Sequence, residues 1–195
     1  MTAQGLWNTA AALPHCAARR YNLIMAERPS IPASTASTTR GHAVEIADLA
    51  ALDALAVRLA QPAETGDTFL LRGELGAGKT TFARAFIVAL ARREKVIPPD
   101  DVPSPTFTLM QSYDLGRIQV FHFDLFRLKS AEEALELGIE DACADGIALI
   151  EWPERLGRMI PADHIEMDLA IMGEGRRQVT ISACGRAAGR YAEFA

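Results

Sequence analysis

The feature that most constrains this chain is a run of small residues between an apolar segment and an amphipathic one. Residues 73–80 read Gly-Glu-Leu-Gly-Ala-Gly-Lys-Thr and match the pattern G-x-x-x-x-G-K-[ST]. Residues 68–72 have the composition of a buried strand, and Phe82, Phe86 and Leu90 recur at the four-residue spacing of a helix face. A strand that enters this loop and a helix that leaves it make the phosphate-binding turn of an α/β domain.

The chemistry of this loop follows from its residue types. Glycine and alanine let the backbone curl so that its N–H groups face an anion, and the N-terminus of the following helix adds partial positive charge. Lys79 supplies a point charge for the β- and γ-phosphates, and Thr80 supplies a hydroxyl for Mg²⁺. The expected phosphate-contacting residues are Gly73, Glu74, Leu75, Gly76, Ala77, Gly78, Lys79, Thr80 and Thr81.

The nucleotide expected in this loop is ATP. Guanine-specific phosphate-loop proteins use an Asn-Lys-x-Asp element, and this chain has no asparagine after Asn22. It also has no D-x-x-G pattern after the loop, so a Ras-type GTPase is disfavoured.

Two carboxylates end apolar segments further along the chain. Asp124 ends residues 118–124, and Glu151 follows residues 147–150. Carboxyl ends of parallel strands meet at the ligand-binding crevice of an open sheet, and Mg²⁺ takes oxygen ligands. Asp124 and Glu151 are therefore both candidates to supply a carboxylate to Mg²⁺ beside the Thr80 hydroxyl.

The remaining pattern predicts a P-loop NTPase-like α/β domain whose mixed, mainly parallel sheet is flanked by helices. Asp48 is placed to cap a helix, and Ser130-Ala-Glu-Glu133 reads as a capping box before a helix that Gly138 closes. Strands are expected at 42–46, 68–72, 107–113, 118–124 and 147–150, and residues 165–172 and 178–184 predict a C-terminal antiparallel hairpin.

The chain divides into a leader, 1–41, and a P-loop ATPase domain, 42–195. The leader has no Asp or Glu up to Met25, and residues 29–41 are rich in Pro, Ser, Thr and Ala. Such a composition buries little apolar surface, which predicts disorder. An upstream start codon, with the working chain beginning near Met25, is favoured over an organellar targeting peptide.

Charge and cysteine content narrow the class of protein. The net charge of −5 disfavours a stand-alone nucleic-acid binder, because phosphate neutralisation dominates that affinity. Cys16, Cys143 and Cys184 are scattered and odd in number, which indicates a reducing compartment. No apolar run approaches the ~20 residues of a membrane helix, so no membrane association is expected.

Four segments together resemble the TsaE (YjeE) family. They are residues 73–81, Ser104-Pro-Thr-Phe107, His122-Phe-Asp-Leu-Phe-Arg127 and Glu151-Trp152, in this order and spacing. The resemblance implies an ATPase of very low intrinsic activity, required for threonylcarbamoyladenosine formation on tRNA. It implies work in the cytoplasm in complex with the TsaD and TsaB proteins, with tRNA contacted only indirectly.

The resemblance also assigns roles to single residues. Asp124 matches the family's aspartate near the nucleotide and Glu151 its metal-side glutamate. Arg176 resembles the arginine of the family's late hairpin that lies near the nucleotide. The resemblance thus implies that Asp124, Glu151 and Lys79 are catalytic and that Thr80 and Glu151 bind the metal. The chain departs from the family at Glu74, where Asp is usual, and at Phe126, where Tyr is usual. The helix after Asp48 has Ala-Ala-Leu where the family often offers a threonine to the nucleotide.

Two other functions compete with this interpretation. A P-loop small-molecule kinase uses the same phosphate cradle but needs a lid with arginines, for which only Arg92-Arg93 and Arg155/Arg158 are clustered. A nucleotide-dependent binding switch would bind ATP without meaningful turnover. Residues 104–107 lie between a helix and a strand, and their chemistry fits equally a loop that senses the γ-phosphate and a plain turn.

Overall fold

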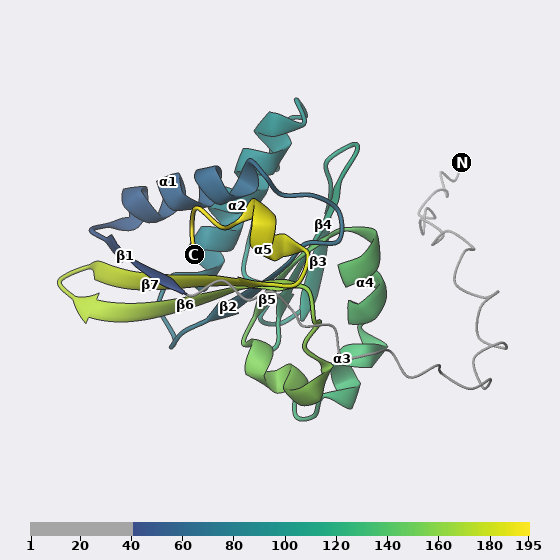
Figure 1. Ribbon diagram of the computed structural model, residues 1–195. Helices are drawn as coiled ribbons and strands as arrows, with labels where there is room; N and C mark the ends of the chain where they lie inside the picture. Colours follow the sequence, from purple (N-terminus) through teal and green to yellow (C-terminus); the bar gives the residue numbers. More distant parts are fainter. Residues whose placement is uncertain (1–40) are drawn as a thin grey trace, which may run out of the picture. The chain divides into compact units, whose positions relative to one another are not determined.

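The computed structural model describes residues 41–195, which form a seven-stranded sheet with helices on both faces (Figure 1). The strand order is β1-β7-β6-β2-β5-β4-β3. The strands are β1 (His42–Ile46), β2 (Thr68–Arg72), β3 (Met110–Asp114), β4 (Gln119–Asp124), β5 (Ile147–Glu151), β6 (His164–Gly173) and β7 (Arg176–Cys184). The helices are α1 (Leu49–Ala60), α2 (Lys79–Arg93), α3 (Glu132–Glu136), α4 (Ile139–Asp145), the 3₁₀ segment η1 (Pro153–Met159) and α5 (Ala187–Arg190).

The centre of the sheet is parallel and its margins are antiparallel. Strand β2 pairs in parallel with β5 and β6, and β5 pairs in parallel with β4. Strands β3, β7 and β1 are antiparallel to their neighbours, so β6 and β7 form the predicted C-terminal hairpin. The predicted mixed α/β fold is therefore confirmed. Because the parallel strands end in register, their carboxyl ends deliver side chains to one edge.

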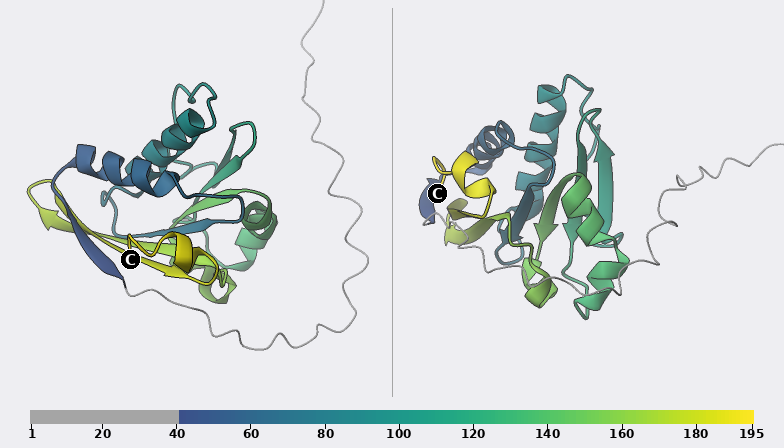
Figure 2. Two further views of the ribbon diagram at one scale, coloured as in Figure 1. Left: turned by 45° about the horizontal axis from the view of Figure 1, so that its top comes forward. Right: turned by 45° about the vertical axis from the view of Figure 1, so that its right-hand side comes forward.

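Two apolar layers cover the sheet (Figure 2). Helices α1, α2 and α5 pack on one face, where Phe69, Phe82 and Phe86 are fully buried. Helices α3 and α4 with η1 pack on the other face, around Leu70 and Phe123. The alternation of Phe69 and Leu70 between the two layers explains why β2 reads as a continuous apolar run.

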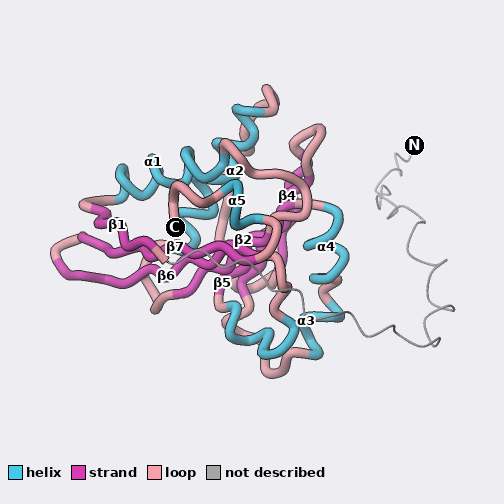
Figure 3. The backbone as a smooth tube through the Cα atoms, viewed as in Figure 1, coloured by secondary structure: helices cyan, strands magenta, loops and turns pink. Residues whose placement is uncertain are grey.

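The first two helices begin where the sequence indicates. The Asp48 side chain caps α1 by accepting a hydrogen bond of 2.8 Å from the Ala51 backbone N–H. Helix α2 begins at Lys79, directly after Gly78 in the left-handed region at φ 110°. The backbone tube shows α2 running from this point across the same sheet face as α1 (Figure 3).

Several predicted boundaries differ in the structure. Strand β3 begins at Met110 and not at residue 107, because Leu109 has φ 64° and the backbone turns there. The Ser130 capping box is not formed: α3 begins at Glu132, and Glu133 accepts a hydrogen bond from the Lys129 backbone N–H instead. Gly138 does end α3, as predicted, but it also starts α4, which the sequence analysis missed together with η1 and α5.

The predicted leader, 1–41, lies almost entirely outside the described residues. The described part of the chain contains no helix that is long and apolar enough to span a membrane.

Candidate functional site

The glycine-rich loop connects the buried end of β2 to the first turn of α2. Gly73, Gly76 and Gly78 have φ values of 134°, 83° and 110°, in the left-handed region that side chains disfavour. A Cβ atom at Gly78 would also lie 2.9 Å from Leu52 Cδ2 of α1. The loop therefore needs glycine for its curl and for its close contact with α1.

Lys79 lies inside this curl. Its side chain is nearly buried, and Nζ donates to the Gly73 carbonyl at 2.7 Å and to the Glu74 carbonyl at 3.0 Å. The ammonium also lies 3.9 Å from the centre of the Trp152 ring, a cation–π contact. Burial lowers the pKa of Lys79, while the carboxylate of Glu151 is the main opposing influence. The ammonium is thus held at the glycine-rich loop by two backbone carbonyls and one aromatic ring.

The two predicted carboxylates are neighbours in the sheet. Asp124 and Glu151 are paired across β4 and β5 and are each under 5% exposed. The Thr80 hydroxyl donates to Glu151 Oε1 at 2.8 Å, so the first turn of α2 touches the end of β5. The sequence prediction that these strand ends meet the phosphate loop matches this placement.

The oxygens gathered at Thr80 and Glu151 suit a hard cation. A hydroxyl and a carboxylate are the ligand types that Mg²⁺ takes in phosphate-loop proteins, where phosphates and water complete the shell. No cluster of three or more His, Cys, Asp or Glu residues with metal-binding geometry occurs within residues 41–195. Thr80 and Glu151 are therefore the residues that would hold a magnesium ion here.

Asp124 holds the loop that follows α2. Its Oδ2 accepts hydrogen bonds from the hydroxyls of Ser104, at 3.2 Å, and Thr106, at 2.5 Å. Its Oδ1 accepts from the Phe126 backbone N–H at 3.1 Å. Phe107, next in the loop, is 83% exposed, and its ring packs on Arg127. The hydroxyl-bearing loop predicted from sequence is thus tied to the carboxylate that faces the phosphate loop.

The arginine beside the glycine-rich loop is Arg177, and not Arg176 as the resemblance implied. Arg177 Nε donates to the Ala77 carbonyl at 2.8 Å, whereas Arg176 is 58% exposed and lies near Glu174. Side chains alternate along β7, so Arg177 shares the α1–α2 face with the buried Val179. The alternation of apolar residues along β7 is the sequence signal that could have identified Arg177 as the arginine on this face.

A cavity of about 260 Å³ gathers most of the predicted residues at this edge. The residues predicted for the site that line this cavity are Leu75, Gly76, Gly78, Lys79, Thr80, Thr81, Asp124 and Glu151. It is also lined by Leu49, Ser104, Thr106, Trp152 and Arg177. Of the other predicted residues, Gly73 and Glu74 reach Lys79 through their carbonyls, Ala77 is buried beneath the loop, and Arg176 lies outside.

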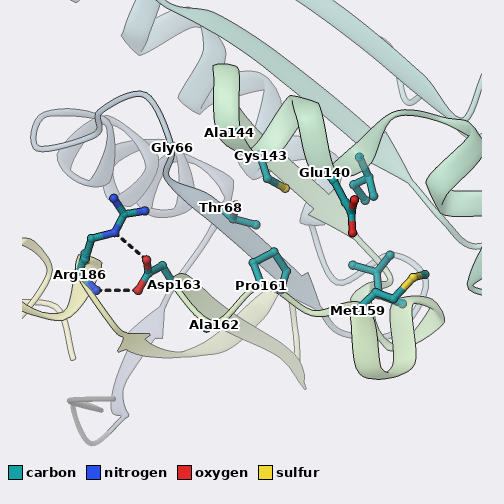
Figure 4. A pocket seen from close by; sticks show the side chains of 12 residues that line it. Gly66, Thr68, Glu140, Cys143, Ala144, Met159, Pro161, Ala162, Asp163 and Arg186 are labelled. Carbon is teal, nitrogen blue, oxygen red and sulfur yellow. Dashed lines mark hydrogen bonds and ion pairs between the residues drawn. The ribbon is translucent and has the colours of Figure 1, made fainter. Parts of the chain in front are cut away.

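A larger cavity, of about 330 Å³, lies at the opposite, amino end of β2 (Figure 4). Thr68 and Cys143 lie at its back, and Asp163 forms an ion pair with Arg186 at 2.6 Å on one side. Burial raises the pKa of the Cys143 thiol. Neither the glycine-rich loop nor the N-terminus of α2 lines this cavity.

Comparison with known proteins gives a consistent result. A family model described as "Threonylcarbamoyl adenosine biosynthesis protein TsaE" matches residues 46–179. The TsaE protein of Rickettsia felis is 39% identical over 127 residues, which cover 65% of this chain and 71% of that protein. The TsaE protein of Bacillus subtilis is 32% identical over 133 residues, covering 68% of this chain and 79% of that protein.

A solved structure supports the fold. The crystal structure of Bacillus subtilis YdiB superposes with a TM-score of 0.60 and 23% sequence identity, covering 82% of this chain and 95% of that one. At this identity the likeness concerns the fold alone.

Proposed function

Because the chain belongs to the TsaE family of threonylcarbamoyladenosine biosynthesis proteins, we propose that it binds ATP and Mg²⁺ at the carboxyl edge of the sheet and hydrolyses ATP slowly. The proposal includes action in the cytoplasm with the TsaD and TsaB proteins, and contact with tRNA only through them. Membership of the TsaE family is itself the evidence for a role in tRNA modification.

One observation carries the proposal. Lys79, Thr80, Asp124 and Glu151 come from three separate elements and line one cavity beside the glycine-rich loop. A loop of this kind alone could be a structural turn. Its convergence with two buried carboxylates and a serine–threonine loop supports nucleotide chemistry.

The binding step uses groups that the described residues already orient. The first turn of α2 presents unpaired backbone N–H groups and the positive end of the helix dipole to a phosphate. Lys79 would transfer its hydrogen bonds from the carbonyls of Gly73 and Glu74 to phosphate oxygens. Mg²⁺, held near Thr80 and Glu151, would neutralise charge on the β- and γ-phosphates.

The hydrolytic step needs a water placed in line with the bond between the γ-phosphorus and the leaving oxygen of ADP. Attack by this water forms one P–O bond and breaks the other, giving ADP and phosphate. Asp124 lies beside the hydroxyls of Ser104 and Thr106. We assign to it the placement of the loop hydroxyls and of the attacking water.

We expect the isolated protein to hydrolyse ATP slowly because of the cations that line the cavity. Among its described lining residues, Arg177 is the one arginine, and its guanidinium donates to the carbonyls of Ala77 and Gly175. It is therefore occupied with holding the loop. An arginine finger contributes about 10³–10⁵ in rate, so a site without one depends on partners for speed.

Arg93, one of the arginines considered for a kinase lid, does not support the kinase alternative. Arg93 Nη1 donates to the carbonyls of Ala60 at 2.7 Å and Ala63 at 2.8 Å, and its Nε contacts Glu94. This side chain joins the end of α2 to the end of α1, and it has no partner in the nucleotide cavity.

Steady-state phosphate release tests the proposal. We expect slow release from Mg²⁺-ATP by the isolated chain and a clear increase when TsaD and TsaB are added. Fast turnover that ignores these proteins would indicate an independent ATPase. Phosphate transfer to a metabolite would indicate a kinase.

A further inference from the structure

Beneath the proposed metal site lies a buried histidine that the function described so far does not use. His122 is on β4, two residues before Asp124, and its side chain is fully buried. Its Nε2 lies 2.9 Å from Glu151 Oε1. In the sheet it is paired with Gln111 of β3 and Leu149 of β5, so its backbone position is fixed on both sides.

The contact has a defined direction once Glu151 is ionised. Glu151 Oε1 also accepts from the Thr80 hydroxyl at 2.8 Å, and a carboxylate oxygen can only accept. His122 Nε2 must then carry a hydrogen and donate it. The other ring nitrogen, Nδ1, is buried and has no hydrogen-bond partner among residues 41–195. The ring therefore makes one directed contact, and that contact is with the carboxylate.

Two donors on one oxygen orient the whole carboxylate. Oε1 is engaged by α2 through Thr80 and by β4 through His122, whereas Oε2 has no hydrogen bond within the described chain. Because the Thr80 hydroxyl gives its hydrogen to Glu151, its lone pairs face elsewhere and are free for a cation. A second side chain that fixes a ligand in this way commonly contributes 10- to 100-fold in metal affinity.

We propose that His122 is a positioning residue for the metal side of the site: through Nε2 it fixes Glu151, and through Glu151 the Thr80 hydroxyl, in the orientation that receives Mg²⁺ with the nucleotide. This inference rests on the proposed function. It assigns no direct contact between His122 and the nucleotide or the metal.

Two substitutions separate this role from a general role in packing. In His122→Gln the amide nitrogen can reach the place of Nε2, whereas in His122→Asn it reaches only the place of Nδ1. The two variants have the same functional group and differ in reach, so Asn is the matched control for Gln. Thermal unfolding of both variants reports on packing separately.

The readout is binding and not turnover. Affinity for a non-hydrolysable ATP analogue is measured with EDTA and again with Mn²⁺, whose free concentration is followed by electron paramagnetic resonance. We expect all three proteins to bind the analogue alike in EDTA. Mn²⁺ affinity should stay within about threefold in His122→Gln and fall about tenfold or more in His122→Asn.

A second measurement needs no variant. Nitrogen-15 NMR of the imidazole in the metal-free protein should show a hydrogen on Nε2 and none on Nδ1. The opposite tautomer would overturn the inference, as would Mn²⁺ binding by His122→Asn equal to that of the unchanged protein, or equal losses in EDTA and Mn²⁺. Failure of the unchanged protein to bind the analogue at all would instead contradict the proposed function.

Discussion

The two ends of strand β2 each border a cavity, and they differ in how their polar groups are arranged. At the amino end, the cavity of Figure 4 is the larger of the two, but two of its three charged side chains, Asp163 and Arg186, form an ion pair, and the third is Glu140. At the carboxyl end, Lys79 is held by backbone carbonyls, and the hydroxyls of Thr80, Ser104 and Thr106 converge on two carboxylates.

Under the proposed function, the ligand is bound by the smaller of these two cavities, so that the arrangement of polar groups matters more than cavity size. Charges that are already paired with each other have fewer hydrogen-bonding positions left for a ligand. At the carboxyl end, by contrast, buried groups are held in contacts that a triphosphate and a cation could replace. The following predictions test this comparison, in order of decreasing expected effect.

Replacing Lys79 by Ala should have the largest effect on binding. We expect ATP-analogue affinity to fall about a hundredfold, because hydrogen bonds to a charged group contribute about 1.5–3 kcal/mol. Isothermal titration calorimetry measures this loss. The matched control at the amino end is Asp163→Asn, which breaks the pair with Arg186 and should leave affinity unchanged. Equal losses in both variants would remove the distinction between the two ends.

Asp124→Asn should separate hydrolysis from binding. Asn keeps the shape of the side chain, but it lacks the negative charge of the carboxylate to which the hydroxyls of Ser104 and Thr106 donate. We expect phosphate release in the presence of the TsaD and TsaB proteins to fall about 10²-fold, with analogue affinity nearly unchanged. Single-turnover assays provide the rate, and a rate within threefold of the unchanged protein would contradict the role assigned to Asp124.

Neighbouring arginines on β7 allow a sharper comparison within the carboxyl end. Arg177→Ala removes the guanidinium that donates to the Ala77 carbonyl, and should weaken analogue binding about tenfold through loss of a charge-assisted contact. Arg176→Ala removes an exposed side chain and should leave binding unchanged. A fluorescent analogue titration distinguishes them, and the reverse order of effects would mean that the hairpin side chains are assigned to the wrong faces.

The smallest effect is expected at the amino end, where charge affects stability. Buried Asp67 accepts hydrogen bonds from Arg190 and from Tyr191 Oη, yet burial raises the pKa of its carboxyl above the ordinary 3.8. The folded state therefore binds a proton more readily than the unfolded state, and the contribution of Asp67 to stability falls as the pH rises above 3.8.

Urea unfolding at a series of pH values tests this sign. The stability of the unchanged protein relative to Asp67→Asn should decline as the pH rises from 3.8 through the raised pKa, and then level off. A relative stability that increases over the same interval would show that the ion pair with Arg190 outweighs burial.

Local features of the sequence predicted which residues lie together at the carboxyl end of β2. The glycine pattern and Lys79 describe a conformation that depends mainly on neighbouring residues. Asp124 and Glu151 could be placed because parallel strands bring their ends together. The segment at 107–109 was wrongly predicted as strand because nothing in its composition reveals the positive φ of Leu109.

The remaining differences between the predictions and the structure arise from contacts between segments that are distant in the sequence. Choosing Arg176 over Arg177 is a shift of one residue, and in a strand such a shift moves a side chain to the opposite face. The start of α4 directly after Gly138 depends on packing against β5 that a short amphipathic segment does not reveal. The sequence identified His122 only as part of a motif. It did not reveal the contact with Glu151, because that contact requires the pairing of β4 with β5.

An NMR titration tests the central claim most directly, because it observes both ends of β2 in one experiment. Backbone amide signals are followed as a non-hydrolysable ATP analogue and Mg²⁺ are added to the chain. The account predicts saturable shifts at residues 73–81, Ser104, Thr106 and Glu151, and none at Cys143 or Asp163. Shifts concentrated at Cys143 and Asp163, with residues 73–81 unchanged, would contradict it.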